Sequence, residues 1–164
     1  MAGGAAVDRD LIGDRGHWNA LLALTKPVGK AETLFRPRFL GDDYPTLDLI
    51  VELVDAPVAF TPFFFVQVRA TQQGYTQGGH LRVQVSAQTM TRLMAYPVPT
   101  SIIGVDNARR GVTHVVASVP SGPTHYPSLP TTHRLDGRTL GLLYDEVLAF
   151  WQQHAATFTT SRFV

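Results

Sequence analysis

The sequence contains no cysteine, which excludes disulfide bonds, thiolate nucleophiles and zinc sites built on cysteine. Charged residues are also scarce: they make up 16% of the 164 residues and nearly cancel, to a formal charge of +1. A polyanion would therefore have to be bound by a local group of Arg or Lys. No segment approaches the roughly 18 apolar residues of a membrane span, and the first residues do not resemble a signal peptide. We expect a cytoplasmic protein with no membrane partner.

The apolar content is that of a folded domain. Hydrophobic residues make up 45% of the chain, enough to form a buried core at this length. We expect residues 1–9 to form a flexible N-terminus and residues 10–164 to form a single domain. The predicted fold class is α/β, with a single central mixed sheet flanked by helices.

Hydrophobic periodicity predicts a helix, three strands, a short fourth strand, a helix, two strands and a final helix. The expected helices cover residues 10–25, 86–96 and 136–155, and Trp18 and Trp151 are expected to pack their helices on the sheet. The expected strands cover residues 32–41, 46–55, 62–71, 81–86, 100–106 and 112–119. Residues 120–133 contain four prolines, which predicts either an ordered loop or a mobile arm.

Polar residues interrupt the apolar strands 46–55 and 62–71. Asp48 lies in the first, and Gln67 and Arg69 share a face of the second because side chains alternate along a strand. If the strands pair, a carboxylate, an amide oxygen and a cation converge, a set suited to Mg²⁺-dependent cleavage of a phosphodiester. The alternative is structural: Asp48 and Glu52 pair with Arg36 or Arg38, and Gln67 and Arg69 lie on the surface of an edge strand.

The stretches "LDLIVEL" and "FFFVQVRAT" resemble the restriction-endonuclease-like PD-(D/E)xK nuclease superfamily, whose signature is Asp followed by (Asp/Glu)-x-Lys on the next strand. They look most like its bacterial branch of domains of unknown function, which has Gln-x-Lys as the second motif. The stretches "FLGDDYPTLDLIVEL", "YPVPTSIIGVD" and "LYDEVLAFW" extend the resemblance over residues 13–151.

The resemblance implies a role for several residues. Asp48 matches the metal-binding aspartate, Gln67 the middle of the second motif and Arg69 its lysine, while Asp14 of the first helix could be a further metal ligand. His17 stands where a glutamate would be expected. A guanidinium remains protonated and cannot act as a base, although it can still neutralise a phosphate.

Two more arginines, Arg109 and Arg110, occupy the tip of a predicted hairpin. They form either a solvated turn or a contact with a nucleic-acid backbone.

Two functions remain open. The first is a DNA endonuclease-like protein of bacterial defence or mobile elements, dependent on Mg²⁺ or Mn²⁺ and acting through Asp48, Gln67 and Arg69. The second is a catalytically inactive nuclease-fold module that binds nucleic acid or a partner protein. DNA is the expected nucleic acid rather than RNA, and the assembly could be a homodimer or a larger defence complex.

Overall fold

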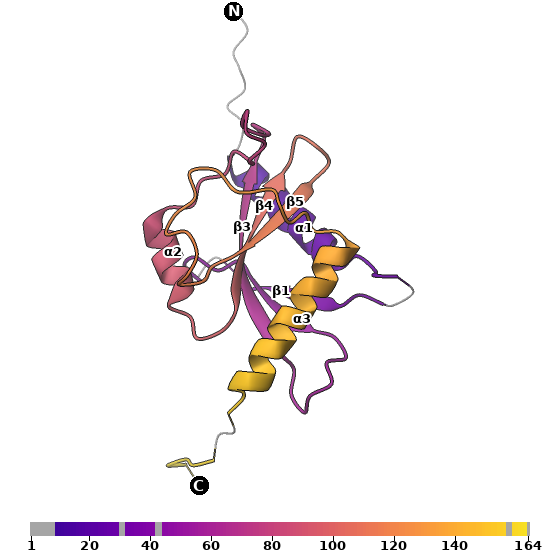
Figure 1. Cartoon of the computed structure of the whole chain (residues 1–164), viewed down its shortest axis with the longest axis vertical. Coiled ribbons are helices and arrows are strands. Elements are labelled where there is room, and N and C mark those ends of the chain that lie inside the picture. Colours follow the sequence, from indigo (N-terminus) through magenta and orange to yellow (C-terminus); the bar gives the residue numbers. More distant parts are fainter. Residues whose placement is uncertain (1–8, 30–31, 42–43, 157–158, 164) are drawn as a thin grey trace, which may run out of the picture.

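The computed structural model describes residues 9–29, 32–41, 44–156 and 159–163. Within these residues, three helices and five strands follow one another in the order α1-β1-β2-β3-α2-β4-β5-α3 (Figure 1). The helices are α1 (Arg9–Leu24), α2 (Ala87–Met94) and α3 (Gly137–His154). The strands are β1 (Phe35–Phe39), β2 (Leu49–Leu53), β3 (Phe63–Thr71), β4 (Thr100–Asp106) and β5 (Val112–Ala117).

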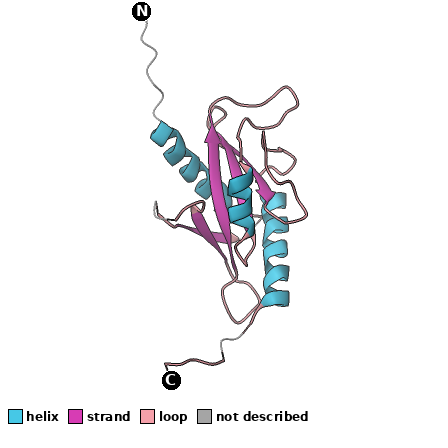
Figure 2. Ribbon diagram, turned by 90° about the vertical axis from the view of Figure 1, so that its left-hand side faces the viewer, coloured by secondary structure: helices cyan, strands magenta, loops and turns pink. Residues whose placement is uncertain are grey.

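The strands form one mixed sheet in the order β1-β2-β3-β4-β5. Neighbouring strands are antiparallel except for β3 and β4, which are parallel and are joined by the crossover that contains α2. Helices lie on both sides of the sheet (Figures 1 and 2). The predicted α/β fold with a single central mixed sheet is confirmed. Of the expected flexible terminus, residues 1–8 lie outside the described residues, and Arg9 already belongs to α1.

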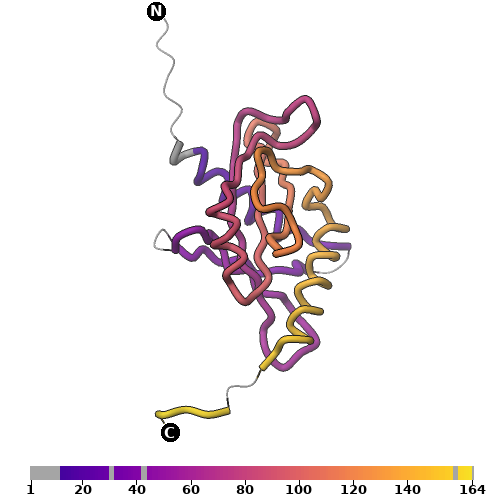
Figure 3. The backbone as a smooth tube through the Cα atoms, turned by 60° about the vertical axis from the view of Figure 1, so that its left-hand side comes forward, coloured from indigo at the N-terminus to yellow at the C-terminus, as the bar shows by residue number. Residues whose placement is uncertain are grey.

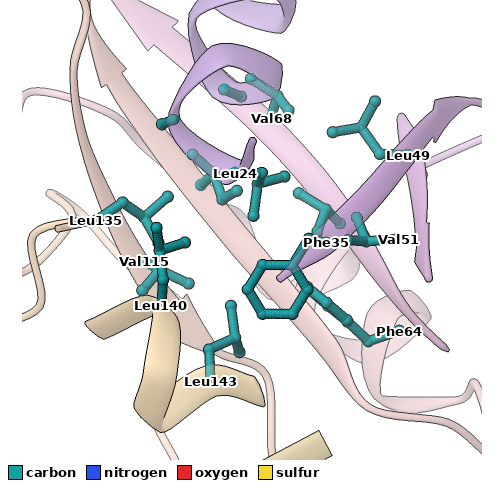
Figure 4. Packing of buried hydrophobic residues seen from close by; sticks show 14 of the residues in the cluster. Leu24, Phe35, Leu49, Val51, Phe64, Val68, Val115, Leu135, Leu140 and Leu143 are labelled. Atoms are coloured by element: carbon teal, nitrogen blue, oxygen red, sulfur yellow. The ribbon is translucent and has the colours of Figure 1, made fainter. Parts of the chain in front are cut away.

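The sheet separates two hydrophobic cores. The first core lies between the sheet and helices α1 and α3 (Figure 4), and includes Ala20, Leu24, Phe35, Leu49, Phe64, Val66, Val68, Leu140 and Val147. The second core lies on the α2 side, and includes Leu47, Leu81, Val83, Val85, Met90, Leu93, Ile102, Tyr126 and Leu129. Because β3 contributes to both cores, its two faces are buried over most of its length.

Segment 81–86 is not the strand that its alternating pattern predicts. Its apolar side chains are buried, but among the described residues its backbone makes isolated bridges rather than a ladder, including Leu81 with Leu129 and Val85 with Tyr126. Both partners belong to residues 120–133, which run beside segment 81–86 (Figure 3). The prolines there cannot donate the hydrogen bonds of a continuous ladder. Segment 120–133 is thus an ordered loop, one of its two expected forms.

The two tryptophans differ. Trp151 packs against the first core, as expected. Its Nε1 also donates a 2.7 Å hydrogen bond to the carbonyl of Phe63. Trp18 was expected to pack on the sheet, but it is 59% exposed. The helix α1 approaches β3 through small residues instead: a Cβ added to Gly16 would lie 2.5 Å from the Cβ of Ala70. Trp18 lies two residues further on, about 200° round the helix from Gly16, and its ring contacts Phe39 of the edge strand β1.

Candidate functional site

The regular alternation of side chains breaks immediately before β2, at Asp48. Leu47 is buried in the second core and Leu49 in the first, although residues two apart in a regular strand face the same side. Thr46 has a φ of 81°, in the left-handed region that a β-branched residue rarely adopts. The side chain of Asp48 is therefore not held to the face of Ile50 and Glu52, as a continuous strand would require.

The carboxylate of Asp48 contacts both the sheet and α1. Its Oδ2 accepts a 2.6 Å hydrogen bond from the backbone N–H of Val68, and its Oδ1 lies 3.3 Å from Nε2 of His17. Both side chains are partly accessible, with 28% of Asp48 and 32% of His17 exposed. The close packing of α1 on β3 brings His17 to this position.

An open groove of about 740 Å³ runs between the start of α1 and the end of β3. Its lining includes His17, Asp48 and Arg69, together with the amide side chains of Gln72 and Gln73. Arg69 is exposed and also lines a second groove, of about 520 Å³, whose lining includes Arg82. The structure thus brings Asp48 and Arg69 into one groove, with His17 as the residue in contact with Asp48.

Gln67 lines neither groove. It is only 4% exposed, and its position in β3 gives it the same face as Phe65, which packs on the second core. Its Oε1 is buried and, within the residues that the structure describes, has no hydrogen-bond partner. The side chain of Gln67 is thus buried, whereas Arg69, two residues further along the same face of β3, is exposed.

Asp14 is exposed and lines a smaller groove of about 300 Å³ that adjoins the first. The other residues that line it are His17, Trp18, Phe39, Gly41 and Asp48. The two grooves meet at His17 and Asp48, which line both of them. Asp14 and Asp48 thus share a groove.

Glu52 forms the ion pairs with Arg36 and Arg38 that the structural alternative predicts. Its Oε2 lies 3.2 Å from Nε of Arg38 and 3.8 Å from Nη1 of Arg36, on the neighbouring strand β1. Glu52 therefore stabilises the edge of the sheet.

Arg109 and Arg110 lie in the turn between β4 and β5, outside the grooves that Arg69 lines. The guanidinium of Arg109 lies 5.1 Å from the centre of the Tyr75 ring, and its Nε is 4.0 Å from Oδ2 of the buried Asp106. Arg110 is exposed, with a φ of 53°. The structure does not bring these two arginines together with Arg69.

A buried polar cluster lies next to Arg109. His114, 5% exposed, has its Nε2 3.1 Å from the hydroxyl of Tyr75. Burial lowers the pKa of His114, and the positive charge of Arg134 lowers it further. Burial also raises the pKa of Tyr75, and the nearby Asp106 adds to this effect. Sequence reasoning did not identify this cluster, although the polar position of His114 inside an apolar strand was a visible signal.

Of the three residues expected to hold Mg²⁺ or Mn²⁺, Asp14 and Asp48 line one groove and Gln67 does not join them. Asp48 already accepts the N–H of Val68 and contacts His17, while the buried oxygen of Gln67 lies outside the groove. Within the part of the chain that the structure describes, no three His, Cys, Asp or Glu side chains are grouped so that they could hold a metal ion.

A scan of protein-family models, a search of curated proteins and a search of solved structures each gave no match to this chain. Among the described residues, none of the helices has the length and apolar character needed to cross a membrane.

Proposed function

We propose that this protein is a nuclease-fold module that binds DNA without cutting it, with a backbone phosphate held by Arg69. The observation that carries the proposal is the position of Arg69, exposed at the end of β3 where two grooves meet. Its planar guanidinium can donate two parallel hydrogen bonds to a phosphate. The resemblance to nucleases supports DNA as the source of that phosphate.

The surroundings of Arg69 suit a phosphodiester chain. Arg82 lines the second groove with Arg69, so two cations lie along one path in a protein whose overall charge is close to zero. The amides of Gln72 and Gln73 line the first groove and can donate hydrogen bonds to phosphate oxygens. A nearly neutral chain needs a local group of cations to bind a polyanion, and this pair of arginines provides one.

Three features favour binding over cleavage. The guanidinium of Arg69 cannot accept a proton from an attacking water. The Asp48 carboxylate is engaged by Val68 and His17, and the Gln67 oxygen lies outside the groove. Of the residues expected to hold the ion, Asp14 and Asp48 thus share a groove, but Gln67 does not join them.

Fluorescence anisotropy with labelled oligonucleotides, single-stranded and duplex, tests the binding. We expect affinity to fall steeply between 50 and 200 mM salt. Arg69→Ala should weaken binding about 10- to 100-fold, the usual range for a charged hydrogen bond, and lower the salt slope by about one. Arg92→Ala, at an exposed position of α2 outside both grooves, is the matched control. Equal effects of the two substitutions, or no binding by the wild type, would overturn the proposal.

One observation favours the second candidate, an endonuclease dependent on Mg²⁺ or Mn²⁺: Asp14 and Asp48, two of the expected metal ligands, line one groove. A plasmid-nicking assay with each ion compares the wild type with Asp48→Asn and Arg69→Lys. We expect no nicking by the wild type. Nicking by the wild type that disappears in Asp48→Asn would replace the binding proposal with the endonuclease.

A further inference from the structure

We infer that Trp18 and Phe39 form a stacking platform for an unpaired base of the bound DNA strand. The inference rests on the proposed function. The DNA that it expects at this site is single-stranded, or is a duplex with an extruded base. Trp18 is 59% exposed and Phe39 44% exposed, and their ring centroids lie 5.5 Å apart at an interplanar angle of 74°. These two aromatic side chains, from α1 and β1, are called the aromatic platform below.

The edge-to-face contact fixes the platform. Phe39 lies nearly perpendicular both to Trp18 and to the His17 ring, whose centroid is 6.0 Å away at 71°. Such contacts restrain the rings while much of the Trp18 surface remains in solvent. An indole held in this way can receive the flat face of a base, because every base has a π-face that can stack on an aromatic ring.

The platform is continuous with the groove that contains Arg69. Trp18 and Phe39 line the smaller groove, Arg69 lines the larger one, and His17 and Asp48 line both. A strand whose phosphate contacts Arg69 can therefore extend past His17 and place a neighbouring base on the platform.

The charges of the smaller groove select a base over a phosphate. Asp14 and Asp48 both line it, and carboxylates repel phosphate groups. Carboxylates also accept hydrogen bonds from the exocyclic amino groups of bases, as in contacts to the N4 amino group of cytosine. In a duplex the base faces are covered by their neighbours, so the platform requires an unpaired or extruded base.

The intrinsic fluorescence of Trp18 provides a direct test. The chain has two tryptophans, so Trp151→Phe leaves Trp18 as the single indole. A short unlabelled single-stranded oligonucleotide should quench its emission, and a blunt duplex of the same sequence should not. Because Trp151 donates a hydrogen bond to Phe63, the folded state of this variant is first checked by circular dichroism.

Anisotropy measurements give the energetic test. Trp18→Ala should weaken single-strand binding about 5- to 150-fold, the range for loss of one stacked base, and Trp18→Phe should restore part of it. Duplex binding should remain unchanged. Leu22→Ala is the matched control, because Leu22 is another large exposed apolar residue of α1, 61% exposed, outside both grooves.

The outcomes separate this inference from the proposed function. Single-strand binding that depends on Arg69 but not on Trp18 would overturn the platform and leave the proposed function intact. Absence of binding to either form of DNA would overturn both. If Trp18→Ala and Leu22→Ala both change the mass of the protein in sedimentation, the exposed side chains belong to a protein interface and the platform is overturned.

Discussion

The Asp48 carboxylate accepts the backbone N–H of Val68 at 2.6 Å, next to the last pair of the β2–β3 ladder, Leu49 with Val66. A side chain thus continues the hydrogen bonding of β3 where the backbone of β2 turns away.

We predict that Asp48→Ala lowers the free energy of unfolding by about 1–3 kcal/mol, because the N–H of Val68 loses its acceptor. Urea denaturation measures the change. Asp14→Ala, which removes an exposed carboxylate nearby, should alter stability by less than about 0.5 kcal/mol. Equal stability of the two variants would contradict a structural role for the Asp48 carboxylate.

A second prediction concerns the contact between α1 and β3. Gly16→Ala would place a Cβ 2.5 Å from the Cβ of Ala70, and we expect a loss of about 1–3 kcal/mol from overpacking. Thermal denaturation measures it. The double variant Gly16→Ala/Ala70→Gly should recover part of the loss.

Gly13 of the same helix is the control for that substitution. Nothing lies within 4 Å of a Cβ added there, so Gly13→Ala should stabilise the protein by up to about 1 kcal/mol through helix propensity. Destabilisation by Gly13→Ala as large as that by Gly16→Ala would show that packing against Ala70 is not the cause.

The sequence pattern predicted the regular elements well and the site only in part. Helices α2 and α3 and the β4–β5 hairpin lie where hydrophobic periodicity predicts them, because the apolar residues of each element are buried on one face or on both. Ser86 caps α2, and its side chain accepts the N–H of Thr89 at 3.1 Å.

The misses have a shared physical origin. A pattern of alternation cannot show that Thr46 adopts a left-handed conformation, so it could not show that Leu47 and Leu49 enter different cores. Nor could it show that α1 approaches β3 on the side of Gly16, with Trp18 on another side and exposed. Both depend on contacts between segments far apart in the chain.

A third prediction concerns the proline-rich loop 120–133. Leu129 is fully buried in the second core, so Leu129→Ala should cost about 2–5 kcal/mol by leaving a cavity. The exposed Leu142 of α3 provides the control, and Leu142→Ala should cost much less in the same urea titration. Equal effects would mean that the loop does not complete the core.

A fourth prediction concerns pH. Burial lowers the pKa of His114 in the folded protein, with Arg134 adding to the effect, below the value of about 6.5 that applies to the unfolded chain. As the pH falls through about 6.5, the unfolded state binds a proton that the folded state does not. The free energy of unfolding contributed by His114 is therefore fully present above that pH and is lost as the pH falls toward the folded pKa.

The comparison of variants isolates this contribution. His114→Gln should give a shallower fall of unfolding free energy between pH 7 and pH 5 than the wild type. His125→Gln, at an exposed position of the loop, should leave the slope unchanged. A slope that is the same in wild type and His114→Gln would contradict the prediction.

The bridges from Leu129 to Leu81 and from Tyr126 to Val85 have a consequence for a chain that has been cut. A protease that cleaved an exposed bond of the loop near His125 would divide the polypeptide, but not the second core, because both sides of the cut remain held by the sheet and by buried side chains. The two fragments would migrate together under native conditions and separate only in denaturant.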